Sequence, residues 1–161
     1  MNNFTLPFSE PEGVLSFDAT ARAFADSTLG KACAVKLDGM RTRFTLDRAL
    51  IHQKVFQVII TFEGERLSQL ELLLILPTDK AGWDGWSEAG ERQRKLQAEQ
   101  WLAATFGLTP TPEPFDLDGQ KITPFQPAWD HPRTLLIPGA KITSYYDSKA
   151  AFAGILCRFE A

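Results

Sequence analysis

The stretch KVFQVIITFEGERLSQLELLLIL, residues 54–76, decides the fold of this chain of 161 residues. Apolar side chains alternate with more polar ones over residues 55–62 and again over residues 70–76, and a period of two is typical of β-strands. Gly64 lies between the two runs and gives the permissive backbone that a short hairpin loop requires. Pro77 ends the second run, which favours a strand over a helix for its leucines. The stretch therefore predicts a central antiparallel hairpin.

Strand-like alternation continues on both sides of this hairpin. Residues 33–37 and 43–47 alternate around an Asp-Gly turn signal, which predicts a second hairpin upstream. Residues 141–146 and 155–159 alternate around a turn at 147–149, which predicts a third hairpin near the C-terminus. Together the three hairpins predict a mainly antiparallel sheet of about six strands.

One segment has the pattern of a long helix. Ser87 is a good N-cap, acidic residues follow it in the first turn, and no proline interrupts the chain over about 88–106. Glu88 with Arg92, and Glu91 with Lys95, have the spacing of surface ion pairs, which predicts a solvated first half. The second half has an apolar stripe that we expect to pack on one face of the sheet: Ala98, Trp101, Leu102, Thr105 and Phe106.

The other segments have weaker patterns. Residues 1–18 are interpreted as an N-terminal extension, and residues 19–29 as a short helix closed by Gly30. Seven of the ten prolines lie within residues 109–138, which predicts a long irregular connection because proline removes backbone donors. A chain of this length is expected to form one domain over 1–161, with an α+β fold.

Composition and charge argue against several classes of partner. The formal net charge is -3 and the sequence pI is about 5.4, so no basic surface is expected to bind nucleic acid or an anionic membrane. The N-terminus lacks a basic region and a long apolar run, and no apolar stretch is long enough to span a bilayer. We therefore expect a cytoplasmic protein.

Residues that could carry chemistry are few. His52 and His131 have no second histidine or cysteine within four residues, so no metal site is predicted. Cys33 and Cys157 occupy inward strand positions, which predicts buried and unreactive thiols. The sequence also lacks a nucleophile elbow and the glycine-rich loops that bind phosphate, so neither a catalytic residue nor a cofactor is predicted.

The least ordinary segment is Trp83-Asp84-Gly85-Trp86-Ser87-Glu88, just ahead of the long helix. Tryptophan combines a large apolar face with one donor and is enriched at binding hot spots, but it also packs helix entries. The two tyrosines of the last hairpin allow the same two interpretations, binding or cross-strand packing. The candidate binding residues are Trp83, Asp84, Trp86, Glu88, Tyr145, Tyr146 and Asp147.

Three motifs resemble a group of small bacterial proteins of unknown function. They are FEGERL at 62–67, WDGWSE at 83–88 followed by a charged helix with Trp101-Leu102, and SYYDSK at 144–149. The resemblance extends over about residues 22–160, and it implies no activity and no catalytic residues. In size, charge and layout the chain is also similar to acidic immunity-type proteins, which neutralise a partner protein.

The leading hypothesis is a non-enzymatic, cytoplasmic bacterial protein that binds another protein or a small ligand. One alternative is a small enzyme whose acid-base groups meet only after folding, drawn from Asp84, Glu88, His131 and Asp147. Another is a structural protein that associates with itself through an exposed strand edge.

Overall fold

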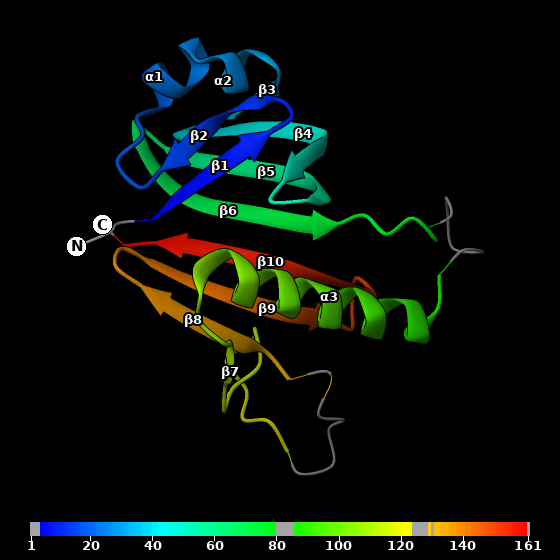
Figure 1. Cartoon of the computed structure of the whole chain (residues 1–161). Helices are drawn as coiled ribbons and strands as arrows, with labels where there is room; N and C mark the ends of the chain where they lie inside the picture. Colours follow the sequence, from blue (N-terminus) through cyan, green and yellow to red (C-terminus); the bar gives the residue numbers. More distant parts are fainter. Residues whose placement is uncertain (1–3, 80–85, 124–128, 130, 161) are drawn as a thin grey trace.

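An eight-stranded antiparallel sheet extends across the molecule, in the order β3-β4-β5-β6-β10-β9-β8-β7 (Figure 1). The computed structural model describes residues 4–79, 86–123, 129 and 131–160. From one edge to the other the strands are β3 (Ala34–Asp38), β4 (Arg41–Ile51), β5 (Lys54–Glu63), β6 (Arg66–Leu74), β10 (Phe152–Phe159), β9 (Ala140–Asp147), β8 (Arg133–Ile137) and β7 (Thr111–Pro112). The α+β prediction is confirmed, but six strands was too few.

The predicted central hairpin is formed by β5 and β6. Phe56 pairs with Leu74, and Ile60 with Leu70, so apolar residues of both strands lie on one face of the sheet. These four side chains are buried. Gly64 adopts a positive φ of 58° in the loop between the strands, as a tight hairpin loop requires.

Helix α3 (Glu88–Phe106) has the predicted bounds. The hydroxyl of Ser87 accepts the Gly90 backbone N–H at 3.0 Å, and Gly107 ends the helix in the left-handed conformation with φ of 71°. The helix packs on β9 and β10, where Figure 1 shows it crossing the sheet face. Within the predicted stripe, Ala98, Trp101 and Leu102 are buried, whereas Thr105 and Phe106 are partly exposed.

The first 18 residues are not a mere extension. They form the hairpin of β1 (Thr5–Ser9) and β2 (Glu12–Ser16), which packs beside β4 on the sheet face that α3 also covers. Pro7 and Pro11 are tolerated because a two-stranded hairpin leaves free edges and a turn for them. The inward side chains of this segment join the core: Phe4, Leu6, Phe8 and Leu15.

The predicted helix over 19–29 is wrong in its bounds, because two shorter helices replace it. They are α1 (Ala21–Asp26) and α2 (Thr28–Lys31), separated by Ser27, whose hydroxyl accepts the Gly30 backbone N–H at 3.0 Å. Gly30 lies inside α2 instead of closing a helix. A Cβ at this position would lie 1.9 Å from the Phe24 carbonyl oxygen, so close backbone approach explains the glycine.

The connection over 109–138 is also more regular than predicted. It contains the short strand β7 and the five-residue strand β8, which pairs with β9 so that Leu135 lies opposite Ile142. Because this segment is rich in proline, β8 was not predicted. It is nevertheless part of the sheet, and its Leu135 contributes to the core. Pro138 and Gly139 form the two-residue loop to β9, in which Gly139 has φ of 83°. The predicted C-terminal hairpin is confirmed as β9 and β10.

Candidate functional site

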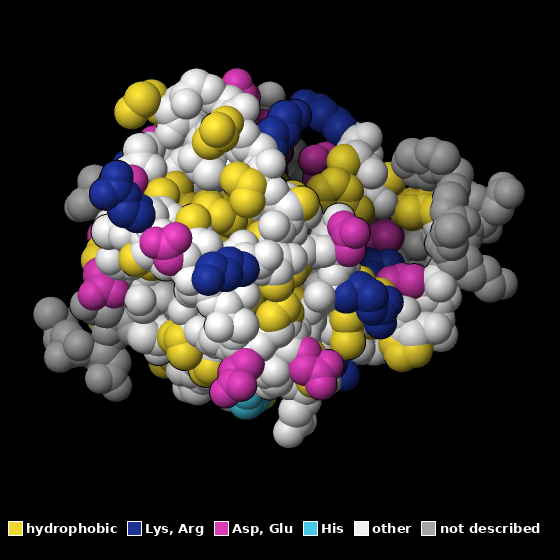
Figure 2. Space-filling model, turned by 90° about the horizontal axis from the view of Figure 1, so that it is seen from above, with side chains coloured by type: hydrophobic (Ala, Val, Ile, Leu, Met, Phe, Trp, Pro, Cys, Tyr) yellow, Lys and Arg dark blue, Asp and Glu magenta, His cyan; other side chains and the backbone are white. Residues whose placement is uncertain are grey.

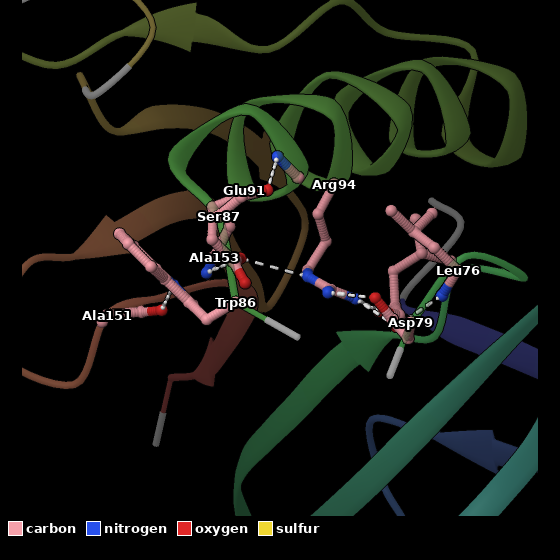
Figure 3. Close-up of polar contacts among 10 residues, drawn as sticks. Leu76, Asp79, Trp86, Ser87, Glu91, Arg94, Ala151 and Ala153 are labelled. Atoms are coloured by element: carbon pink, nitrogen blue, oxygen red, sulfur yellow. Dashed lines mark hydrogen bonds and ion pairs between the residues drawn. The ribbon is translucent and has the colours of Figure 1, made fainter. Parts of the chain in front are cut away.

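A cleft of about 540 Å³ opens between the end of β6 and the first turns of α3 (Figure 3). The loop between β9 and β10 forms its third wall. Its partly buried apolar lining residues include Leu73, Ile75 and Phe152, and its polar lining residues are Asp79, Ser87, Glu91 and Arg94. Three segments that are distant in the sequence therefore meet at this cleft.

Arg94 holds these segments together. Its Nε donates to Glu91 Oε2 at 3.1 Å, and its two terminal nitrogens donate to the Asp79 carboxylate at 2.9 and 2.6 Å. One of these nitrogens also donates to the Leu74 carbonyl oxygen at the end of β6. Glu91 in turn accepts the Ala153 backbone N–H of β10 at 2.9 Å. The network thus ties α3 to both strands that border the cleft (Figure 3).

The electrostatics of the network favour the charged forms of Asp79 and Arg94. The hydrogen bond from Arg94 is the main cause that lowers the pKa of Asp79 below its usual value, against a smaller opposing effect of burial. Burial alone would lower the pKa of Arg94, but the hydrogen bond to Asp79 and the charges of Glu91 and Asp79 outweigh it, so that pKa is raised. The pair of Asp79 and Arg94 is therefore charged at neutral pH.

We expect Asp79→Asn to lower the free energy of unfolding at pH 7 by about 1.5 kcal/mol, because a hydrogen bond between charged groups is weakened. Since folding lowers the pKa of Asp79, its stabilising contribution is complete above the unfolded-state pKa of about 4 and is lost as the pH falls through the lower, folded-state pKa. Urea unfolding of both proteins checks this: the difference should shrink as the pH falls below about 4. A difference that is constant with pH would contradict the assignment.

The first half of α3 is solvated on one side only, whereas the prediction had both of its ion pairs in solvent. Glu91 is buried and pairs with Arg94 instead of Lys95, because the sheet side of the helix faces the end of β6. Lys95 has only 2% of its surface exposed and donates to Glu99 at 2.5 Å. Glu99 also lies 3.6 Å from the Arg133 guanidinium of β8. Only the outer pair behaves as predicted, since exposed Glu88 lies 3.6 Å from Arg92.

Trp86 forms the edge of the cleft. Its indole Nε1 donates to the Ala151 carbonyl oxygen at 2.6 Å, which fixes the ring against the β9–β10 loop, yet 40% of the side chain remains exposed (Figure 3). Trp83 and Asp84, the other candidates of this segment, lie outside the described residues. The structure therefore places one aromatic candidate at the cleft.

The candidates on β9 lie apart from the cleft surface and from one another. Tyr146 is on the α3 side of the sheet, where its ring centroid lies 4.7 Å from that of Trp129, and the guanidinium of Arg92 lies 5.0 Å from the Trp129 ring. Tyr145 is on the opposite side, 6.1 Å from the Phe152 ring. Burial, followed by the nearby carboxylates of Glu71 and Asp147, raises the pKa of Tyr145 to about 12.

Asp147 has a structural position at the start of the β9–β10 loop. Its carboxylate accepts the backbone N–H groups of Lys149 at 2.9 Å and Ala150 at 3.3 Å. These bonds shape the loop that presents the Ala151 carbonyl to Trp86. Asp147 therefore supports the cleft wall without lining the cleft.

The groups proposed for acid-base chemistry are dispersed. Glu88 is exposed at the start of α3, Asp147 caps its loop, and His131 is partly exposed just before β8. Within the part of the chain that the structure describes, no three histidine, cysteine, aspartate or glutamate residues are placed to hold a metal ion. None of the helices in this part is long and apolar enough to cross a membrane.

The two thiols differ in burial. Cys157 is buried as predicted, whereas Cys33 is only partly buried, because it precedes the exposed edge strand β3. Burial raises the pKa of both thiols, to about 11 for Cys33. Both thiols are free.

Sequence reasoning missed the two residues that organise the cleft, Asp79 and Arg94. Asp79 follows Pro77 in a turn, where its carboxylate accepts the Leu76 backbone N–H at 2.8 Å. Arg94 lies three residues after Glu91, a spacing that also signals an ion pair on a helix. The sequence therefore contained a signal for the pair of Glu91 and Arg94, but it contained none for Asp79 as the third residue of the network.

No family model, curated protein or solved structure matches this chain.

Proposed function

We propose that this protein is a non-enzymatic binding protein that holds a segment of a partner protein in the cleft beside Trp86. The observation that carries the proposal is the exposed face of this tryptophan, fixed by its hydrogen bond to Ala151 at the edge of a 540 Å³ cleft. Tryptophan side chains that are held rigid and half exposed are typical of binding hot spots. Ligand pockets have comparable volumes.

The charge arrangement favours binding over proton transfer. Arg94 donates to both oxygens of the Asp79 carboxylate, which a general base would need free, and also to Oε2 of Glu91. Glu91 is further engaged by the Ala153 backbone. A general base also needs a pKa near the working pH, whereas the pKa of Asp79 is lowered.

The same arrangement indicates the chemistry of the partner. Among the described residues that line the cleft, two acidic side chains surround one guanidinium, so this lining is formally net negative, as the whole chain is at -3. Leu73, Ile75 and Phe152 also line the cleft and are only partly buried, so they add apolar surface to it. We infer a partner segment with an apolar side chain beside a basic residue. An immunity-like role in the bacterial cytoplasm, in which the chain neutralises a basic partner protein, is one form of the proposal, and it is supported by the likeness in size, charge and layout.

We expect Trp86→Ala to weaken partner binding at least about tenfold, since truncation of a hot-spot tryptophan typically costs 2 kcal/mol or more. Immobilised wild-type protein and mass spectrometry would identify the partner, and titration calorimetry with the purified partner would then measure both affinities. Leu96→Ala is the matched control, because Leu96 is an exposed apolar residue of α3 that does not line the cleft. Equal affinity of a folded Trp86→Ala variant and the wild type would refute the proposed site.

A further inference from the structure

The edge strand β3 is open to solvent along its whole length. All five of its residues are exposed, and so are the apolar side chains Val35, Leu37 and Met40, at 55%, 75% and 76% of their surface. Figure 2 looks down on the end of the molecule where β3 lies with α1 and α2, and hydrophobic side chains are visible there among charged ones. The opposite edge differs, because β7 is only two residues long and contains Pro112, which blocks strand pairing.

The backbone of β3 has free hydrogen-bonding groups at defined positions. Gly39, with φ of 60°, and Met40 form the two-residue loop to β4, and Asp38 pairs with Arg41 across it. In such a hairpin the closing pair exchanges backbone hydrogen bonds, and every second pair does the same. Val35 and Leu37 fall between these pairs, so their N–H and C=O groups point away from β4.

We propose that a second copy of this chain pairs with β3 in antiparallel orientation, with the two-fold axis at Leu37. In this register Leu37 lies opposite Leu37 of the second copy, and the two residues exchange backbone hydrogen bonds. Lys36 lies opposite Asp38 of the second copy, and symmetry repeats this pair on the other side of the axis. The two sheets then join into one continuous sheet, and the apolar side chains at the edge pack across the junction.

Charge complementarity selects this register. Within one chain Lys36 faces Arg43, a like charge, and Lys36 forms no ion pair among the described residues. The second copy supplies the missing opposite charge directly across the strand, where such pairs are stabilising. An axis at Lys36 would pair the outward backbone groups of Val35 with those of Leu37 of the second copy, but it would place two lysines opposite each other. An axis at Val35 would leave Lys36 opposite Ala34.

The dimer is expected to be reversible, because one short strand from each copy makes a small interface. Sedimentation equilibrium of the wild type from about 1 µM to about 1 mM should show a mass that rises from that of a monomer toward that of a dimer. Lys36→Asp and Asp38→Lys each place like charges opposite each other twice in the dimer. Each variant should therefore weaken self-association at least about tenfold.

Mixing the two variants tests the register itself. A Lys36→Asp chain paired with an Asp38→Lys chain has opposite charges at both positions, so an equimolar mixture should form a heterodimer at concentrations where each variant alone is monomeric. The double variant Lys36→Asp/Asp38→Lys should also recover self-association. All positions changed are exposed, and urea unfolding would verify that the variants are folded. A monomeric wild type over the whole range, or a dimer that neither variant weakens, would overturn the inference, as would a mixture that stays monomeric. None of these outcomes depends on the cleft beside Trp86.

Discussion

Replacement of Trp101 by alanine is expected to lower the free energy of unfolding by about 3–5 kcal/mol, as for other buried aromatic residues. Only 4% of this side chain is exposed, and its ring contacts Phe56 of β5 with a centroid distance of 4.7 Å. Its indole Nε1 donates to the carbonyl oxygens of Ile51 at 3.0 Å and His52 at 3.2 Å, at the turn between β4 and β5. Truncation would leave a cavity and remove the donor that these carbonyls share.

Urea unfolding of wild-type and Trp101→Ala proteins measures this effect. Trp101→Phe should lose less stability, because it keeps an aromatic ring against Phe56 but removes the donor to Ile51 and His52. Leu96→Ala is the control on the exposed side of α3 and should change stability by less than about 0.5 kcal/mol. A loss below about 1 kcal/mol for Trp101→Ala would mean that the helix contributes little to the core.

Trp101 also illustrates what the sequence predicts well. Its burial follows from the helical stripe, and the bounds of α3 follow from Ser87 as N-cap and the uninterrupted chain to Gly107. The β5–β6 hairpin follows in the same way from a period of two and the glycine in its loop. These elements are encoded locally, within a few residues of each other, so local patterns suffice to predict them.

The errors have a different physical origin. Residues 1–18 were interpreted as an N-terminal extension, yet their hairpin of β1 and β2 is stabilised by tertiary burial of Phe4 and Leu6 against the sheet. The prolines of residues 109–138 led to the prediction of an irregular connection, whereas β8 forms there and is stabilised by its pairing with β9. In each case a contact with a distant element overrides the local preference, and a single sequence contains no direct record of that contact.

The cleft shows the same limit at the level of single side chains. Arg94 and Asp79 are 15 residues apart, and Glu91 and Ala153 are 62 apart, so their hydrogen bonds exist only after the sheet has assembled. The aromatic-acidic segment was a useful signal because it led to Trp86. Surface ion pairs were the natural interpretation of the charges in α3, since most charged helix residues are solvated. The strand order brings Leu74 and Ala153 beside the helix and buries those charges instead.

Glu91 is the member of this network whose loss should matter most. Its carboxylate is buried, and it accepts both the Arg94 Nε–H at 3.1 Å and the Ala153 backbone N–H at 2.9 Å. Removing one partner of a buried ion pair leaves the other charge uncompensated, and a buried N–H without an acceptor adds a desolvation cost. We therefore expect Glu91→Ala to lower the free energy of unfolding at pH 7 by about 3–5 kcal/mol.

Two matched variants separate these causes in urea unfolding. Glu91→Gln retains an oxygen that can accept the Ala153 N–H but lacks the charge that balances Arg94, so it should lose clearly less stability than Glu91→Ala. Glu88→Ala removes an exposed acid one turn earlier, whose pair with Arg92 contributes little, and should be near neutral. If Glu91→Ala were as mild as Glu88→Ala, then Glu91 would not hold α3 on β10. If instead Glu91→Gln were as severe as Glu91→Ala, the charge of Glu91 opposite Arg94 would account for the whole effect, and the bond to Ala153 would contribute little.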